Sequence, residues 1–322
     1  VIGAGAMGTR HATAWRSIKD AKLIAVADPV EERAKKLKER LGFKVWTKDY
    51  REAINRSDVD IVSICTPTYY HPEITIFAAE RGKHILCEKP IALTLDAADE
   101  MIRVCKRNNV FLEIGFQRRY MEMTRKLKEL MQDQIIGRPV MFLHNVGTEI
   151  RTVVGKPSMH DMKGNGGPII DNCCHLFDLW RVIFSSEPTW VMARGFILAK
   201  NRPELAHIKE LAPDTATLTV EHSSGDLGVI NISWGLPPKV HTPGNTYIWG
   251  SDGAILLKGN RQIIIRKEGG KEMTFNFTLL EHPKVTQIRH FFRVVLGEAE
   301  PMATGEDGRK ALQVSLSLIE SM

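Results

Sequence analysis

The sequence lacks the cysteine spacing of a zinc site or of a disulfide framework. Its 322 residues include only five cysteines, an odd number, and no two of them form a CxxC pair. Zinc sites and small disulfide-rich domains are recognised by such spacing. We therefore expect no bound metal and free thiols, which favours a reducing compartment and hence the cytoplasm.

Long apolar runs and clustered basic charge are also missing. No stretch approaches the ~18 consecutive apolar residues of a membrane span, and no secretory signal is recognisable. Lys and Arg outnumber Asp and Glu by 44 to 38, but the basic residues are scattered. The sequence thus predicts a soluble protein with neither a membrane nor a nucleic acid as partner. Because Val1 and Ile2 are short for a strand before a glycine turn, we expect further residues upstream in the natural protein.

What is present is a composition typical of globular proteins, with 43% hydrophobic and 25% charged residues. The length suggests about two domains. Up to Arg118, short β-branched runs alternate with helical segments, which is the pattern of an α/β domain with a doubly wound parallel sheet. We predict this domain over residues 1–118 and a second domain over residues 119–322. Strands are expected at residues 1–2, 23–27, 44–46, 61–65, 84–87 and 111–114.

The glycines at the start of the chain match the G-x-G-x-x-G motif of Rossmann dinucleotide-binding domains. Gly3 allows the turn, Gly5 leaves room for a pyrophosphate, and Gly8 lets helix and strand pack closely. Ala6 and Met7 lie within the motif, so we include them in the candidate cofactor site. Similar turns occur in methyltransferases and in helices without ligands, so the motif alone does not decide.

Asp28 strengthens the dinucleotide interpretation. It directly follows the second expected strand, 20 residues after Gly8. A carboxylate at this position can accept hydrogen bonds from both hydroxyls of the adenosine ribose. A 2′-phosphate would meet a like charge there, so NAD is favoured and NADP is less expected. Arg33 is near enough in sequence to keep dual use open. The alternative is that Asp28 only shapes the turn before Pro29.

Polar clusters follow the next three strands, at the sheet edge where open α/β sheets bind ligands. Thr66, Pro67 and His71 follow one strand, and their backbone could line the nicotinamide side, although ordinary turn chemistry explains them too. Glu88 and Lys89 follow the next strand, where a lysine could reach a substrate hydroxyl or simply lie on the surface. Gln117 lies after the last strand and, with neighbouring arginines, suits polyhydroxylated or anionic ligands.

The second domain has a different pattern of helical and strand-like segments. A helix to about Gln132 precedes strand-like runs separated by Gly, Asn and Asp, which predicts hairpins and an antiparallel sheet. The expected strands are residues 140–146, 190–197, 215–221, 227–234, 245–250, 254–257 and 262–266. Residues 155–167 and 235–244 read as long loops.

A helix is predicted from Ile170 to Phe184, after a run of glycines. Asp171 and His175 are four residues apart and would project from one face of it. The reference pKa of histidine lies near neutral pH, so His175 could take a proton from a substrate hydroxyl while Asp171 orients it. A structural histidine held by nearby carboxylates is the alternative.

Taken together, the motifs resemble those of the Gfo/Idh/MocA oxidoreductases, which include glucose-fructose oxidoreductase and inositol 2-dehydrogenase. The resemblance spans nearly the whole chain and rests on residues 3–8, Thr66 and Pro67 with His71, Glu88-Lys89-Pro90, and Gly166-Gly167 with Asp171 and His175. It implies a Rossmann domain followed by an α+β domain built on an open, mostly antiparallel sheet. It also implies bound NAD(P), hydride exchange with a sugar or polyol, and an active site of Lys89, Asp171 and His175. Cys173 and Cys174 stand where the family more usually has small residues, so the substrate's shape could differ.

The sequence is also compatible with two other functions. A regulator of the same fold could bind NAD without turnover, although it would not need Lys89 and His175. A glycosidase could use NAD as a transient oxidant. We also expect a homodimer or homotetramer through the uncovered face of the second sheet. Candidates for contacts with substrate hydroxyls are His144, Asn145, Arg151, His160 and Lys163.

Overall fold

The computed structural model describes residues 1–150, 157–278 and 280–322. Two compact units emerge: residues 1–120 with 281–312, and residues 121–280 with 313–322. The first break lies two residues after the expected position at 118. A contiguous second domain over 119–322 differs from this division, because residues 281–312 belong to the first unit. Arg151 lies outside the described residues, as do the first two positions of the loop expected at 155–167.

The first unit is built on a parallel sheet, as predicted. Its strands are short and almost wholly apolar because helices cover both faces. β1 pairs with β2, and β3, β4 and β5 pair in that order. Ile2 bridges to both Ala27 and Ile64, so it joins the two groups. The strands are β1 (Ala25–Ala27), β2 (Val45–Thr47), β3 (Ile61–Ile64), β4 (His84–Cys87) and β5 (Leu112–Ile114).

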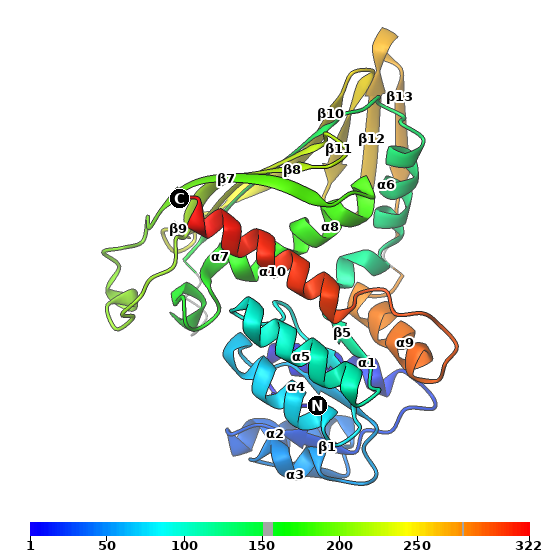
Figure 1. Ribbon diagram of the computed structural model, residues 1–322, viewed down its shortest axis with the longest axis vertical. Helices are drawn as coiled ribbons and strands as arrows, with labels where there is room; N and C mark the ends of the chain where they lie inside the picture. The colour runs from blue at the N-terminus through cyan, green and yellow to red at the C-terminus, as the bar shows by residue number, and fades with distance from the viewer. Residues whose placement is uncertain (151–156, 279) are drawn as a thin grey trace. The chain divides into compact units, whose positions relative to one another are not determined.

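Helices connect these strands, with ends set by ordinary capping chemistry. Thr94 accepts a hydrogen bond from Ala97 N at the start of α5, and Gly42 ends α2 in the left-handed conformation. The helices are α1 (Ala6–Arg16), α2 (Glu31–Leu41), α3 (Tyr50–Ile54), α4 (His71–Ala79) and α5 (Leu95–Arg107) (Figure 1). This alternation of strand and helix is the doubly wound pattern expected from the sequence.

The carboxyl-terminal part of the chain returns to the first unit as α9 (Pro283–Val295). Its buried face, with Ile288, Phe291 and Val294, packs against Trp15 of α1 and Leu86 of β4. Burial of this apolar face is the physical reason that the first unit is not contiguous in sequence. The following helix, α10 (Gly305–Glu320), contributes residues to both units.

The second unit contains an eight-stranded sheet in the order β13-β12-β11-β10-β6-β9-β8-β7. All neighbouring strands are antiparallel except β6 and β9, which confirms the expected mostly antiparallel sheet. The strands are β6 (Met141–Glu149), β7 (Pro188–Phe196), β8 (Thr215–His222), β9 (Leu227–Leu236), β10 (Thr242–Gly250), β11 (Gly253–Lys258), β12 (Gln262–Lys267) and β13 (Glu272–Asn276) (Figure 1).

Helices pack on one face of this sheet. Trp180 and Phe184 of α8 (Cys174–Phe184) contact Phe142 of β6 with ring centroids 5.6 and 6.5 Å apart. Gly228 of β9 lies under Trp180, where a Cβ atom would come within 2.4 Å of the indole ring. α6 (Glu122–Gln132) packs beside α8. Among the described residues, no helix is both long and apolar enough to cross a membrane.

Candidate active site

The glycine loop forms a cradle at the start of α1. Gly3 has a φ of +92°, and a Cβ atom there would lie 2.7 Å from Cys65 O; a Cβ at Gly8 would lie 1.7 Å from Gly3 O. These two glycines are therefore required by the packing of the loop itself. A Cβ at Gly5 would instead meet open space, and Gly5 caps α1 without a side-chain hydrogen bond. The amides of the first turn, which include Ala6 and Met7, are left for an anion.

Asp28 is buried directly after β1. Its Oδ2 accepts a hydrogen bond of 2.7 Å from Ala4 N in the glycine loop, and its Oδ1 accepts one of 2.9 Å from Val30 N. The carboxylate thus shapes its own turn, as the alternative interpretation held, and also fixes the glycine loop. A carboxylate has about four acceptor positions, so two hydrogen bonds leave capacity for ribose hydroxyls. Arg33 is exposed in the first turn of α2.

His71 connects the loops that follow β3 and β4. Its Nδ1 lies 2.8 Å from Pro90 O and its Nε2 lies 3.1 Å from Thr66 O. Burial lowers the pKa of His71, because it disfavours the charged imidazolium more than these carbonyl contacts favour it. Both ring nitrogens face protein oxygens, so the geometry supports a positioning role for His71 rather than direct contact with a cofactor.

Two buried polar atoms near this edge lack a hydrogen-bond partner within the described part of the chain: Thr66 Oγ1, after β3, and Gln117 Oε1, after β5. Buried polar atoms are normally paired, so unpaired ones are typical of a site that a ligand completes. Together with the open space at Gly5 and the first turn of α1, which has no side-chain cap, they fit a bound dinucleotide. Pro67 lies between Thr66 and the short helix η1 (Thr68–Tyr70).

Glu88 and Lys89 follow β4 at the same edge. Glu88 is 5% exposed, and its carboxylate contacts two side chains that sequence reasoning did not single out, His11 of α1 and Lys284 of α9. Lys284 lies 196 positions from Glu88, and no local pattern predicts so distant a pairing. His11 follows the glycine motif closely but carries no spacing signal of its own.

The region of Asp171 and His175 differs from the single helix predicted over 170–184. The structure has α7 (Gly167–Asp171) and α8, separated at Asn172 and Cys173. The amides of both intervening residues bond to Pro168 O at 2.9 Å, which interrupts the regular helical ladder. Asp171 therefore ends one helix while His175 lies in the first turn of the next, so the expected four-residue spacing on one helix face does not apply.

Both residues are nevertheless buried, each 8% exposed, and Asp178 one turn further on is 1% exposed. Leu176, Leu179 and Ile183 of α8 are buried as well, which fixes this helix in the core of the second unit. The Sγ of Cys174 lies 3.3 Å from Asp171 O. The two cysteines between Asp171 and His175 therefore serve as small buried residues at the break between the helices.

The residues expected to contact substrate hydroxyls lie in different environments. Two of them are on β6, where successive side chains point to opposite faces of the sheet. His144 lies on the face that carries Phe142, the face packed against α8, and its Nδ1 is 2.7 Å from Thr246 Oγ1. Asn145 lies on the opposite, open face and accepts a hydrogen bond from Asn231. His160 is buried beside Trp234. Lys163 is 83% exposed and pairs with Glu210, as expected of a surface lysine.

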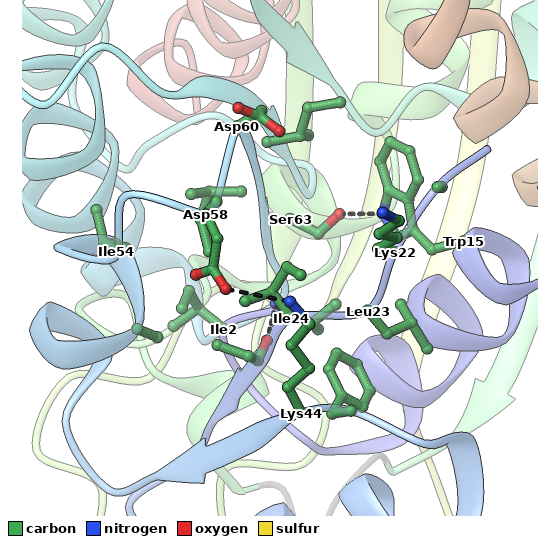
Figure 2. Close-up of a pocket in the computed structure, with 18 of the residues that line it drawn as sticks. Ile2, Trp15, Lys22, Leu23, Ile24, Lys44, Ile54, Asp58, Asp60 and Ser63 are labelled. Atoms are coloured by element: carbon green, nitrogen blue, oxygen red, sulfur yellow. Dashed lines mark hydrogen bonds and ion pairs between the residues drawn. The ribbon is translucent and has the colours of Figure 1, made fainter.

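A cavity in the first unit lies at the other end of the sheet (Figure 2). It is lined by Leu23 and Ile24, which precede β1, and by Asp60 and Ile61 at the start of β3. These are the amino ends of the strands, whereas open α/β sheets bind nucleotides at the carboxyl ends. We therefore do not assign the cofactor to this cavity.

Comparison with known proteins identifies the class. Residues 1–116 match the oxidoreductase family with an NAD-binding Rossmann fold, and residues 124–256 match the GFO/IDH/MocA C-terminal domain. The fold and the glycine cradle are thus those of an NAD-binding oxidoreductase. The chain belongs to the Gfo/Idh/MocA family, as its motifs predicted.

Full-length relatives support this assignment. The chain is 31% identical to myo-inositol 2-dehydrogenase of Thermotoga maritima, over 100% of this chain and 95% of that protein. It is 28% identical to scyllo-inositol 2-dehydrogenase (NAD(+)) of Bacillus subtilis, over 100% and 92%. The crystal structure of a probable dehydrogenase from Thermotoga maritima has a TM-score of 0.80 at 30% identity, covering 99% of this chain and 95% of that one.

Proposed function

We propose that this protein is an NAD-dependent dehydrogenase that oxidises a secondary hydroxyl of a cyclic polyol or sugar, of the inositol or hexose kind. The observation that carries the proposal is the glycine cradle at the same sheet edge as Lys89, with buried Asp28 bonded to that cradle. The similarity to two inositol dehydrogenases over the full chain supports the substrate class.

The proposed chemistry divides between the two units. Bound NAD supplies the acceptor for the hydride. Lys89 donates a hydrogen bond to the reacting hydroxyl oxygen and stabilises the negative charge that develops there. His175 takes the hydroxyl proton, and Asp171 orients the imidazole. The proposal requires Lys89 and His175 to reach the same hydroxyl group.

The cofactor site is proposed to consist of the residues expected from the sequence. The geometry suggests a separate role for each group of them. Gly5, Ala6 and Met7 take the pyrophosphate, and Asp28 takes the ribose hydroxyls. Gly3 and Gly8 maintain the cradle. Arg33, Thr66, Pro67, His71, Glu88, Lys89 and Gln117 complete the site, with His71 and Glu88 acting through the loops that they hold.

A screen for NADH formation with a panel of inositols and hexoses tests the function. Turnover with one of these compounds, lost in His175→Ala while NAD still binds, is the expected result. Release of a sugar from a glycoside without net NADH would indicate the glycosidase alternative instead. Tight NAD binding with no turnover of any polyol or sugar would indicate a regulator.

We further propose a cytoplasmic homodimer or homotetramer. All five cysteines are free thiols, which suits a reducing compartment. The open face of the second sheet carries exposed apolar side chains on alternate positions of β7, namely Trp190, Met192 and Phe196. Trp249 of β10 adds to this open-face patch. Exposed apolar surface of this kind marks protein–protein interfaces.

A further inference from the structure

A buried ion pair lies directly behind the lysine proposed to act on the substrate. Lys284 is 1% exposed, and its Nζ donates a 2.6 Å hydrogen bond to Glu88 Oε1. His11 is fully buried, and its Nε2 lies 2.7 Å from the same oxygen. One carboxylate thus holds two partners from helices on either side of it in sequence, α1 and α9. Buried charges are rare unless paired, so this arrangement is a specific feature of the fold.

The remaining contacts of this group also involve the ends of the strands. Lys284 Nζ lies 3.2 Å from Gln287 Oε1, and Gln287 Nε2 donates a 2.9 Å hydrogen bond to Ile114 O at the end of β5. A Cβ at Gly115 would come within 2.8 Å of Glu88 Oε2. The first unit therefore keeps a space for the Glu88 carboxylate that only a glycine at position 115 leaves.

The next residue along the chain is Lys89. Its backbone N–H donates to Glu88 Oε2 at 3.3 Å, so the carboxylate that Lys284 holds also contacts the backbone of Lys89. On the far side, Pro90 O is held by His71. The backbone of residues 88–90 is thus held on both sides. Of these contacts, the one from Lys284 comes from the carboxyl-terminal segment of the first unit, residues 281–312.

We propose that Lys284 is a positioning residue for Lys89, because its ammonium group fixes Glu88 and thereby the backbone from which the Lys89 side chain extends. The inference rests on the proposed function in assigning Lys89 to the substrate. Without Lys284, Glu88 loses its buried lysine partner and keeps the contacts with His11 and with the Lys89 backbone, so the residues after β4 are held less firmly. A displacement of the Lys89 ammonium group by about 1 Å would be enough to reduce turnover strongly.

The first test measures positioning without turnover. In NAD-loaded protein, amide hydrogen exchange of a peptide covering residues 85–92 should be at least about tenfold faster in Lys284→Met than in wild type. The matched control is Lys106→Met, which removes an exposed lysine paired with Glu306 on the same unit and should leave exchange in this peptide unchanged. Wild-type exchange in Lys284→Met would overturn the proposal.

The second test measures coupling to Lys89. Lys284→Met should lower kcat/KM for the polyol by roughly 10- to 100-fold, and should lower it by less than about threefold in a Lys89→Ala background. A full loss in that background would mean that Lys284 does not act through Lys89, and would overturn the proposal. Lys106→Met should stay within about twofold of wild type.

A last variant separates positioning from loss of folding. Glu88→Gln combined with Lys284→Met removes both charges, so no unpaired carboxylate stays buried. This double variant should fold and should retain the loss of kcat/KM. If it regains wild-type kcat/KM, the ion pair has no role in positioning. Wild-type protein that turns over no polyol or sugar would instead contradict the proposed function, while the exchange measurement would still decide the role of Lys284.

Discussion

At the scale of single residues, three of the candidate site residues are already held by contacts within the protein. Asp28, His71 and Glu88 each make short contacts with backbone or side-chain atoms of the first unit. Such contacts fix the geometry of the loops before any ligand binds, which reduces the entropy lost on binding. The side chains proposed to take part in the chemistry are therefore few, and their substitutions should have separable effects.

The proposed base is the most direct residue to test. His175→Ala should lower kcat by roughly 10² to 10⁴ while the Kd for NAD changes little, because general base catalysis acts on the hydroxyl proton and not on the cofactor. Lys89→Ala should reduce kcat comparably. Steady-state kinetics and calorimetric titration of NAD measure the two effects. A wild-type rate in His175→Ala would show that another group accepts the proton, and a wild-type rate in Lys89→Ala would show that Lys89 does not stabilise the reacting oxygen.

Cofactor preference is the test for Asp28. We expect NAD to bind at least about tenfold more tightly than NADP, since the carboxylate repels a 2′-phosphate. Asp28→Asn should narrow this preference and keeps an oxygen that can accept the Ala4 hydrogen bond, whereas Asp28→Ala should also loosen the glycine loop. Titration of both cofactors measures this. Equal affinities in the wild type would indicate that Arg33 controls the pocket.

Glu113 of β5 should make stability depend on pH. Burial raises its pKa to about 7, although Tyr120 donates a 2.5 Å hydrogen bond to Oε1. In the folded state it is neutral below that value, and in the unfolded chain it ionises above about 4.5. Its contribution to stability is therefore present below pH 4.5 and is lost as pH rises toward about 7.

Glu113→Gln mimics the neutral carboxyl group and should remove this loss. The variant should exceed the wild type in free energy of unfolding by up to about 3 kcal/mol at pH 8, and by less than about 1 kcal/mol at pH 5. Urea unfolding at the two pH values measures the difference. The exposed Glu39→Gln of α2 is the control. An equal difference at both pH values would contradict an altered ionisation of Glu113.

At the scale of helices and strands, the sequence predicted which elements exist better than it predicted where they begin and end. Short β-branched runs identified all five parallel strands, because strands buried on both faces are continuously apolar. β13 was not predicted, since its Glu-Met-Thr-Phe-Asn pattern has only two apolar residues and forms an edge. The break between α7 and α8 was missed because Pro168 and the Asn172-Cys173 step disturb hydrogen bonding without disturbing the apolar period.

The candidate site could be predicted where its residues lie in local motifs, as with Gly3 to Gly8 or Glu88 and Lys89. It could not be predicted where packing brings distant segments together. Lys284 is an ordinary lysine in the sequence, and it becomes significant only because α9 packs on α1 and brings it to Glu88. Long-range contacts of this kind depend on tertiary burial, which local patterns do not encode.

The packing of α9 can be tested through Phe291, which is fully buried. Phe291→Ala should lower the free energy of unfolding by about 3 to 5 kcal/mol, through lost burial and the cavity left beside α1. Leu296→Ala, at an exposed position just after the same helix, should change it by less than about 0.5 kcal/mol. Urea unfolding measures both. Similar values for the two variants would mean that α9 contributes little to the first unit.

At the scale of the whole molecule, the second unit has one sheet face packed by helices and one face without them among the described residues. The open-face patch of Trp190, Met192, Phe196 and Trp249 is 48–59% exposed. Between β7 and β10, Thr217, Asn231 and Asn145 form a row of side-chain hydrogen bonds across β8, β9 and β6. The exposed apolar side chains therefore flank polar groups that already have partners, so burial of this face in an interface would not leave those groups unpaired.

A second copy of the chain is the occupant we expect, because an exposed sheet face with apolar side chains can pair with itself about a twofold axis. Light scattering at micromolar concentration should give two or four times the mass of one chain. Met192→Lys with Phe196→Lys should shift this mass toward that of one chain, since two charges would be buried without partners. Leu296→Lys, on the first unit, is the matched control and should leave the mass unchanged. A wild-type mass equal to one chain would refute the assembly but would not touch the enzymatic assignment, because that assignment rests on the family match and on none of the four residues of the open-face patch.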